Sequence, residues 1–433
     1  MSGGRGAAGG GRGGGDADAA QGGPGGRGRD GRDAPRGAGG RIPRTAWPRL
    51  AVLTAATFAA ITTEIMPVGL LRPMSESFGV DEATVGLLVS VYALAVTVLA
   101  LPVTLATTRM PRKRLLVGTL VAYAASNLVI ALAPTFALAA VGRGIGGLAH
   151  AVFFSVVTSY ASELVPHHLV GRALAIVYAG TAVGSILGLP LATTIGTTFG
   201  WPVAFLAVAG VTVLLAALAL ALPSVAGSPA QVGISLRTWW RRGLMTVASA
   251  NGMLYLGHFA LYTFITPLLL TVGVSLGAVG PALLLFGVAG IVGLWISGAF
   301  VDRRPRRLML ALTALLLLAL VALAVLVPSG SLVGVLVACC VWTLTLGALP
   351  SLFMTAAVRT GGAPPDIVGA LINMFSNIGI SAGAAVGGLV FTAAGIGALP
   401  VFALVLVAAS LALMLVARRR AFPPGAPRPP AAL

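Results

Sequence analysis

Acidic side chains are scarce in this chain of 433 residues, which has 11 Asp and Glu against 28 Lys and Arg. All charged residues together make up 9% of the sequence, whereas an average soluble domain has roughly 25%. Hydrophobic residues make up 57%, and the mean hydropathy is +0.98. So few charges among so many apolar side chains exclude a soluble globular protein.

Cysteine is nearly absent as well, which removes further classes of site. Cys339 and Cys340 are adjacent in one apolar run and indicate neither a disulfide framework nor a metal site. A nucleotide-binding motif of the type G-x-x-x-x-G-K-[ST] is missing, so we expect no cofactor and an ion gradient as the energy source. The net charge of +17 does not indicate a nucleic-acid partner, because the basic residues lie between apolar runs rather than among aromatics on a folded face.

Long apolar runs dominate the rest of the chain. Residues 1–45 form a Gly- and Arg-rich tail that we predict to be disordered, and the remainder has room for about twelve membrane-spanning helices of ~20 residues. The runs form two groups of six, at 50–71, 84–107, 115–133, 136–160, 173–195 and 202–222, then 244–272, 278–300, 308–327, 332–358, 368–394 and 399–417. This pattern predicts an all-α membrane protein with 12 transmembrane helices in two six-helix pseudo-repeats.

Positive charge predicts the orientation in the lipid bilayer. Every Lys and Arg except Arg72 and Arg143 falls on one side if each run spans the membrane. By the positive-inside rule this side is cytoplasmic, so both termini are expected there. The expected segments are a cytoplasmic tail at 1–45, an N-terminal bundle at 46–223, a cytoplasmic linker at 224–243, a C-terminal bundle at 244–417 and a cytoplasmic tail at 418–433.

The two halves also repeat in sequence, at a spacing of about 200 residues. The glycines at 180, 184 and 188 recur at 379, 383 and 387, and Thr63 and Pro67 recur as Thr263 and Pro267. Two halves that start on the same side of the membrane form a parallel repeat, and a substrate path is expected between them.

Several motifs resemble those of the major facilitator superfamily. The stretch Gly298-Ala-Phe-Val-Asp302-Arg303-Arg304-Pro305-Arg306-Arg307 is similar to the family's G-x-x-x-D-R-x-G-R-R signature, and the resemblance implies a gating role for Asp302 and Arg303. In the first-half copy, Thr104 and Thr108 stand where Gly and Asp are expected.

Two further motifs resemble those of the drug:proton antiporter branch. They are Arg143-Gly-Ile-Gly-Gly-Leu-Ala-His150, and the glycines Gly180, Gly184 and Gly188 followed by Pro190. Within that branch, Thr62-Thr-Glu-Ile-Met-Pro-Val-Gly-Leu-Leu71 and Gly188-Leu-Pro-Leu191 look most like bacterial sugar efflux transporters. We expect the glycines to form a close helix-packing surface and Pro190 to kink its helix.

Glu64 is the one acidic residue deep within an apolar run, and Arg143 is the one base. A carboxylate at membrane depth is costly unless it is partnered, hydrated or protonated. One hypothesis is that Glu64 takes up and loses a proton while Arg143 controls how readily it does so. The other is a permanent structural pair, or a Glu64 side chain that caps a kink near Pro67.

Polar and aromatic side chains at helical spacing are the candidates for substrate binding. His150 shares a helix face with Arg143, and Asn251, Tyr255, His258 and Tyr262 form a stripe on the seventh run. Asn373 and Asn377 form an i, i+4 pair, and Trp342 offers a flat apolar surface. Hydrogen bonding between helices, with no ligand, is the alternative for each of these residues.

Together these observations favour a proton-coupled exporter of sugars or sugar-like solutes in the cell membrane, acting as a monomer on a small molecule and protons. The first alternative is a multidrug or antibiotic:proton antiporter, and the second is a non-transporting membrane receptor or scaffold. An enzyme is not expected, because one deep acid cannot build a catalytic set of Ser, His and acid.

Overall fold

The computed structural model describes residues 42–107, 109–166, 169–226, 242–300, 305–360 and 365–417. All regular elements in these ranges are helical. Most of the predicted tails and linker lies outside the described residues, as do Asp302 and Arg303.

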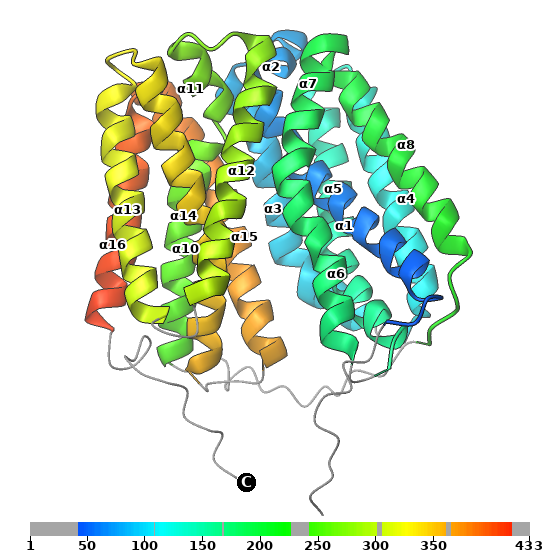
Figure 1. Cartoon of the computed structure of the whole chain (residues 1–433). Helices are drawn as coiled ribbons and strands as arrows, with labels where there is room; N and C mark the ends of the chain where they lie inside the picture. Colours follow the sequence, from blue (N-terminus) through cyan, green and yellow to red (C-terminus); the bar gives the residue numbers. More distant parts are fainter. Residues whose placement is uncertain are drawn as a thin grey trace, which may run out of the picture. The chain divides into compact units, whose positions relative to one another are not determined.

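The helices of the first set belong to the first six predicted runs, and most of the long helices run nearly parallel to one another (Figure 1). They are α1 (Trp47–Gly69), α2 (Leu71–Phe78), α3 (Glu82–Thr107), α4 (Arg112–Ala131), α5 (Phe136–Glu163), α6 (Val170–Val183), the π-helical turn η2 (Gly184–Gly188), α7 (Leu189–Phe199) and α8 (Trp201–Leu220).

The helices of the second set belong to the last six runs. They are α10 (Arg242–Tyr262), α11 (Ile265–Thr271), α12 (Leu276–Phe300), α13 (Pro305–Leu326), α14 (Leu332–Arg359), α15 (Pro365–Ala394) and α16 (Ala398–Val416). Among the described residues, 11 helices are long and apolar enough to cross a membrane, and the bent pair α10 and α11 makes up to 12. The predicted all-α membrane fold with two six-helix repeats is confirmed.

Two spans differ from the straight helices that the apolar runs predict. The run at 244–272 is broken between α10 and α11 by a bend of 46°. Pro267 has no N–H group, so the carbonyl of Thr263 loses its helical donor at this point. The fifth span is interrupted by η2, which ends two residues before Pro190, where the missing N–H group likewise frees a carbonyl one turn earlier.

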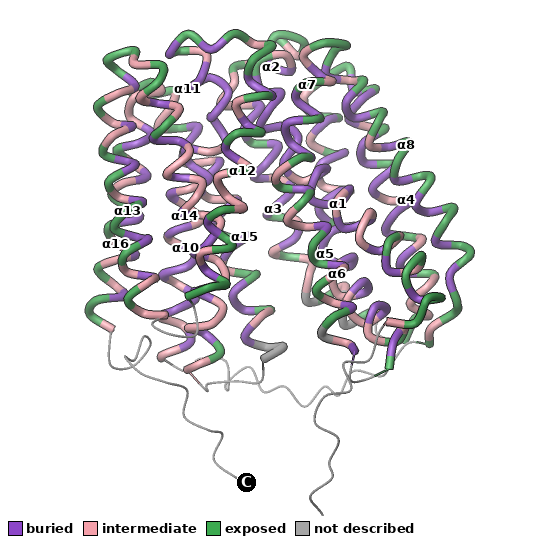
Figure 2. Tube along the Cα trace, viewed as in Figure 1, coloured by how far each residue is buried: buried purple, intermediate pink, exposed green. Residues whose placement is uncertain are grey.

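The outward faces carry large apolar side chains, as a lipid-facing surface requires. Figure 2 shows exposed residues along α8 and α13, and Leu214 is 60% exposed and Leu318 66% exposed. A soluble protein does not display so many such side chains. The chain is a multi-pass membrane protein.

Glycines let one helix pair approach closely in each set. A Cβ atom at Gly180 would overlap the carbonyl oxygen of Thr54 on α1, and one at Gly188 would overlap the hydroxyl of Thr62. In the second set, a Cβ atom at Gly383 would lie 2.6 Å from the carbonyl oxygen of Leu256 on α10. The repeated glycines therefore bring the fifth span against the first, and the eleventh against the seventh.

The two sets touch through α3 and α15 and through α7 and α12. The hydroxyl of Ser90 donates to the carbonyl of Ser381 at 2.9 Å, and the hydroxyl of Ser381 donates back to the carbonyl of Ser90 at 3.0 Å. Thr266 donates to the carbonyl of Val68 at 2.9 Å. These hydrogen bonds lie in the halves of the helices nearer α2 and α11, so the sets are held together on that side.

Candidate functional site

Glu64 lies on α1, three residues before Pro67. Its side chain is 14% exposed, and its carboxyl group accepts no hydrogen bond from the described residues. The imidazole of His150 on α5 lies nearby, with its Nε2 3.9 Å from Oε2 of Glu64. The carboxyl group is thus shielded from solvent without a fixed partner.

Arg143 on α5 is fully buried, yet it does not pair with the carboxylate of Glu64. Its guanidinium donates to three backbone carbonyls, those of Leu88 at 2.9 Å, Thr63 at 2.6 Å and Glu64 at 2.6 Å. The ring of Tyr92 covers it, with the guanidinium carbon 4.2 Å from the ring centroid. The two residues meet, but Arg143 contacts the backbone of Glu64 and not its carboxylate.

Proline explains this choice of partner. Pro67 has no N–H group, so the carbonyl of Thr63, four residues earlier, has no helical donor. A buried carbonyl without a donor is costly, and Arg143 supplies that donor from the neighbouring helix. The counterpart of α5 in the second set is α14, which has no arginine before Arg359 at its end. No arginine of α14 can therefore supply a donor, and the seventh span breaks near Pro267, the counterpart of Pro67.

His150 connects Glu64 to a tyrosine that the sequence analysis missed. Tyr92 of α3 is buried, and its hydroxyl lies 2.9 Å from Nδ1 of His150. When the tyrosine donates, Nε2 of the neutral imidazole carries the proton and faces Glu64. Tyr92 thus contacts both Arg143 and His150. The one sequence feature that could have identified it is that it is the lone tyrosine in a mostly apolar run.

The predicted stripe on α10 divides into two environments. Asn251 is buried, and its amide donates to the hydroxyl of Ser376 on α15 at 2.8 Å, so it joins two helices. Tyr255, His258 and Tyr262 are only partly buried. The rings of His258 and Tyr262 are stacked, with centroids 4.9 Å apart.

Trp342 and the asparagine pair complete the predicted substrate-binding residues. Trp342 is 1% exposed, and its ring lies 5.2 Å from that of His258. Asn377 donates to the carbonyl of Asn373 at 3.0 Å and to its side-chain oxygen at 3.3 Å. Asn373 is exposed, whereas Asn377 is buried.

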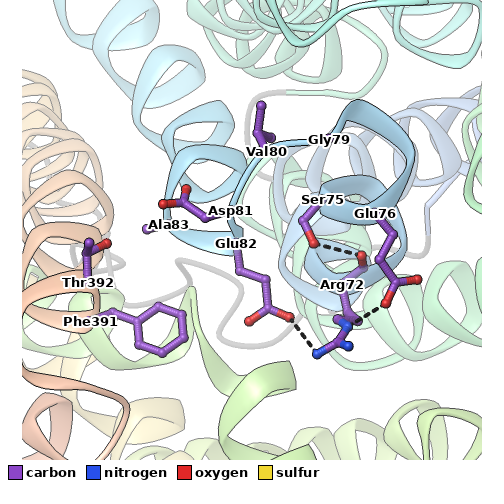
Figure 3. A pocket seen from close by; sticks show the side chains of 10 residues that line it. All are labelled: Arg72, Ser75, Glu76, Gly79, Val80, Asp81, Glu82, Ala83, Phe391 and Thr392. Carbon is purple, nitrogen blue, oxygen red and sulfur yellow. Dashed lines mark hydrogen bonds and ion pairs between the residues drawn. The ribbon is translucent and has the colours of Figure 1, made fainter.

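An open cavity of about 560 Å³ lies at the end of the helices marked by α2 (Figure 3). Its lining comes from α2, from the loop at residues 79–81, from the start of α3, and from Phe391 and Thr392 on α15. Arg72 lies between two carboxylates, 2.6 Å from Glu76 and 3.9 Å from Glu82. The hydrogen bond that Arg72 donates to the carboxylate of Glu76 raises the pKa of Arg72. No group of three His, Cys, Asp or Glu side chains suited to a metal is found among the described residues.

A sequence profile of the Major Facilitator Superfamily matches residues 51–369. Two chloramphenicol efflux pumps of Mycobacterium tuberculosis, from strains H37Rv and CDC 1551, are each 33% identical over 382 residues, which cover 83% of this chain and 90% of theirs.

Solved structures show the same fold at low identity. A bacterial homolog of the human lysosomal transporter Spinster, inward-facing and occupied, has a TM-score of 0.69 at 15% identity and covers 88% of this chain and 98% of its own. A mutant of the nucleoside transporter NupG has a TM-score of 0.65 at 15% identity and covers 85% of this chain and 98% of its own.

Proposed function

This chain belongs to the Major Facilitator Superfamily, and we propose that it exports an uncharged amphipathic compound of the chloramphenicol type in exchange for external protons. The chain is a transporter, which sets aside the alternatives of a receptor and a scaffold. We further propose that it acts as a monomer in the cell membrane with both termini in the cytoplasm, since positive charge gathers on that side.

The relatives favour a drug rather than a sugar as the substrate. The motifs on the first and fifth spans resemble those of sugar exporters, but two relatives that match along most of the chain are named as chloramphenicol pumps. The side chains of the second set agree with an amphipathic ligand, because the rings of Tyr262 and Trp342 beside His258 each combine an apolar face with a hydrogen-bonding group. Chloramphenicol offers a flat ring together with hydroxyl and amide groups, which such a mixed surface suits.

Glu64 is the proposed proton carrier, and the arrangement around Arg143 supports this role. Because Arg143 donates to three backbone carbonyls, it is already satisfied without the carboxylate of Glu64. A carboxyl group with no fixed partner at membrane depth is costly in its charged form and gains stability on taking up a proton. A permanent ion pair would remove this freedom.

The proposed cycle alternates the charge of Glu64 with the opening of the two sets. When the sets part on the outer side, a proton reaches Glu64 and the substrate leaves. The neutral site returns to the cytoplasmic side, where the proton is lost and another substrate binds. His150 and Tyr92 are proposed to orient the carboxyl group during this exchange, since Nε2 of His150 faces it at 3.9 Å.

Transport by purified protein in lipid vesicles tests this function. With an imposed pH difference, the wild-type chain should accumulate labelled chloramphenicol against its gradient. Glu64→Gln should abolish uphill accumulation but keep exchange of labelled for unlabelled substrate, because the amide cannot carry a proton. The matched control is Glu76→Gln, whose side chain is 63% exposed and should leave uphill transport unchanged. Undiminished accumulation by Glu64→Gln would contradict the proposal.

A further inference from the structure

The third span of the first set, α4, carries buried polar side chains that its counterpart lacks. Tyr123, Ser126 and Asn127 are each 0% exposed. The counterpart in the second set is α13, whose buried residues beyond Thr313 are all leucine or alanine. Packing of a third span against its neighbours therefore does not require polar side chains at this depth, where an unsatisfied polar group is costly.

Two of these side chains hold the helices of the candidate site in place. The amide of Asn127 donates to the hydroxyl of Thr63, the neighbour of Glu64 on α1, at 3.1 Å. The hydroxyl of Ser126 donates to the carbonyl of Gly142 on α5 at 2.7 Å, one residue before the arginine of the site. The buried polar side chains of α4 thus contact both helices that carry the proposed proton carrier and its neighbours.

Tyr123 differs from these two because its hydroxyl is not used in packing. Its ring lies edge-on to those of Phe153 and His150, with centroids 5.7 Å and 6.5 Å away. The hydroxyl is buried and has no well-aligned hydrogen-bond partner among the described residues, and the polar group within its reach is the hydroxyl of Tyr92. A phenylalanine would make the same ring contacts without burying an unsatisfied hydroxyl. The hydroxyl of Tyr123 therefore has a use in another arrangement of the site.

A hydroxyl group can donate one hydrogen bond and accept another at the same time. The hydroxyl of Tyr92 lies 2.9 Å from Nδ1 of His150 and can donate to it, while its oxygen keeps a lone pair for another donor. Donation from Tyr123 to that oxygen completes a chain through Tyr92 and the neutral imidazole, with the N–H of Nε2 directed at Glu64. Each bond in such a chain polarises the next one, and every group keeps its own proton.

We propose that Tyr123 is a positioning residue for the proton carrier, and that its hydroxyl completes this chain when Glu64 is charged. An ionised carboxylate needs donors, and the completed chain strengthens the one that the imidazole of His150 offers. Arg143 also faces Glu64, but it donates to three backbone carbonyls. When Glu64 takes up a proton, its demand for a donor falls and the hydroxyl of Tyr123 is released. This inference rests on the proposed function and adds to it a residue on a third helix.

Infrared difference spectroscopy of the purified full chain tests this inference. Addition of chloramphenicol should remove the carboxyl stretching band of protonated Glu64, which is identified by its absence from Glu64→Gln. In Tyr123→Phe at the same pH, the ratio of charged to neutral carboxyl in the substrate-bound chain should fall about tenfold, because the charged form loses a hydrogen-bond chain. Since Tyr123 acts through Tyr92, adding Tyr123→Phe to a Tyr92→Phe chain should produce no further fall.

Tyr160→Phe on α5 is the matched control, because Tyr160 is equally buried and its hydroxyl donates to the carbonyl of Pro223, outside the site. It should leave the band and its response to substrate unchanged. Should Tyr123→Phe fail to fold, Tyr123→Leu, which copies the apolar face of α13, gives the same measurement. A wild-type ratio in the Tyr123 variant, or an equal fall in Tyr160→Phe, would overturn the role of Tyr123 and leave the proposed function standing. A wild-type chain that binds substrate without any change in the Glu64 band would overturn both.

Discussion

At the scale of single residues, three carbonyl groups determine what Arg143 does. A buried guanidinium must find acceptors, and it finds them on the backbone of α1 and α3 at 2.6 to 2.9 Å. The arginine therefore supports the helix that carries Glu64, because it replaces the donor that Pro67 lacks. This support does not depend on the charge of Glu64, which agrees with the proposed role of Glu64 as a proton carrier.

Arg143→Lys tests this supporting role. A lysine ammonium is a compact point charge and cannot serve three carbonyls in the fork geometry of a guanidinium. We expect the free energy of unfolding to fall by about 2 kcal/mol or more, since hydrogen bonds to charged groups contribute about 1.5–3 kcal/mol each. Thermal unfolding measures the change in a Cys340→Ala background, which removes the partly exposed thiol, followed with a thiol-reactive dye that reaches buried Cys339 only on unfolding.

Arg72→Lys is the matched control for that experiment. The Arg72 side chain is 53% exposed and pairs with carboxylates on the surface. Exposed pairs contribute about 0–1 kcal/mol, so the melting temperature should hardly change. Equal melting temperatures for Arg143→Lys and the wild type would contradict the account of Arg143.

At the scale of helices, glycine sets how closely α10 and α15 approach. Gly383→Ala should destabilise the chain by about 1–3 kcal/mol, because its Cβ atom would press on the backbone of α10. Gly118→Ala in α4 is the control, since nothing lies within 4 Å of a Cβ atom there. It should be neutral or stabilise by about 0.5–1 kcal/mol. Thermal unfolding of both variants checks the pair, and a stable Gly383→Ala protein would be inconsistent with this packing.

Asp81 begins α3 as its N-cap, with the carboxylate accepting from the backbone N–H of Thr84 at 2.7 Å. Asp81→Ala should cost about 1 kcal/mol of stability. The hydrogen bonds from Thr84 lower the pKa of Asp81 in the folded chain. The contribution is therefore complete above the unfolded pKa of about 4, and it is lost as the pH falls through the lowered folded pKa.

Melting temperatures of the wild type, Asp81→Ala and Asp81→Asn across this acidic range check the cap. Asp81→Asn keeps an acceptor oxygen, so it should retain most of the stability without the pH dependence. A difference between wild type and Asp81→Ala that persists unchanged at the lowest pH would speak against the carboxylate as the cap.

The sequence predicts elements better than it predicts contacts. Apolar runs and their length identify the spans because lipid demands both, and glycine spacing identifies the close helix pairs. The sequence does not predict the bend between α10 and α11. Pro67 in the first set lies within one continuous helix, and no local sequence feature distinguishes it from Pro267, where the helix breaks. The role of Tyr92 was missed as well, because its contacts depend on how α3 crosses α5.

At the scale of the whole molecule, the paired serines hold the two sets together on the side of α2. Each serine hydroxyl of Ser90 and Ser381 donates to the other's carbonyl, so the contact is symmetric and small. The proposed cycle requires this contact to open, because in that cycle the proton reaches Glu64 from the side of α2.

Cross-linking of these two positions tests whether the sets must part there. Ser90→Cys with Ser381→Cys, in a background with Cys339→Ala and Cys340→Ala, should transport normally when reduced and stop when oxidised. Reductant should restore transport, and either single cysteine variant should be unaffected by oxidation. Full transport by the oxidised, cross-linked chain would show that the sets need not separate at this contact.

The central claim is that Glu64 exchanges its proton as substrate binds, and proton release on substrate addition measures this most directly. Purified chain in weakly buffered detergent solution is mixed with chloramphenicol, and a pH-sensitive dye reports the protons released. The account predicts about one proton per bound molecule for the wild type and none for Glu64→Gln, although the variant still binds. Equal proton release from Glu64→Gln, or no release from a wild-type chain that binds substrate, would contradict it.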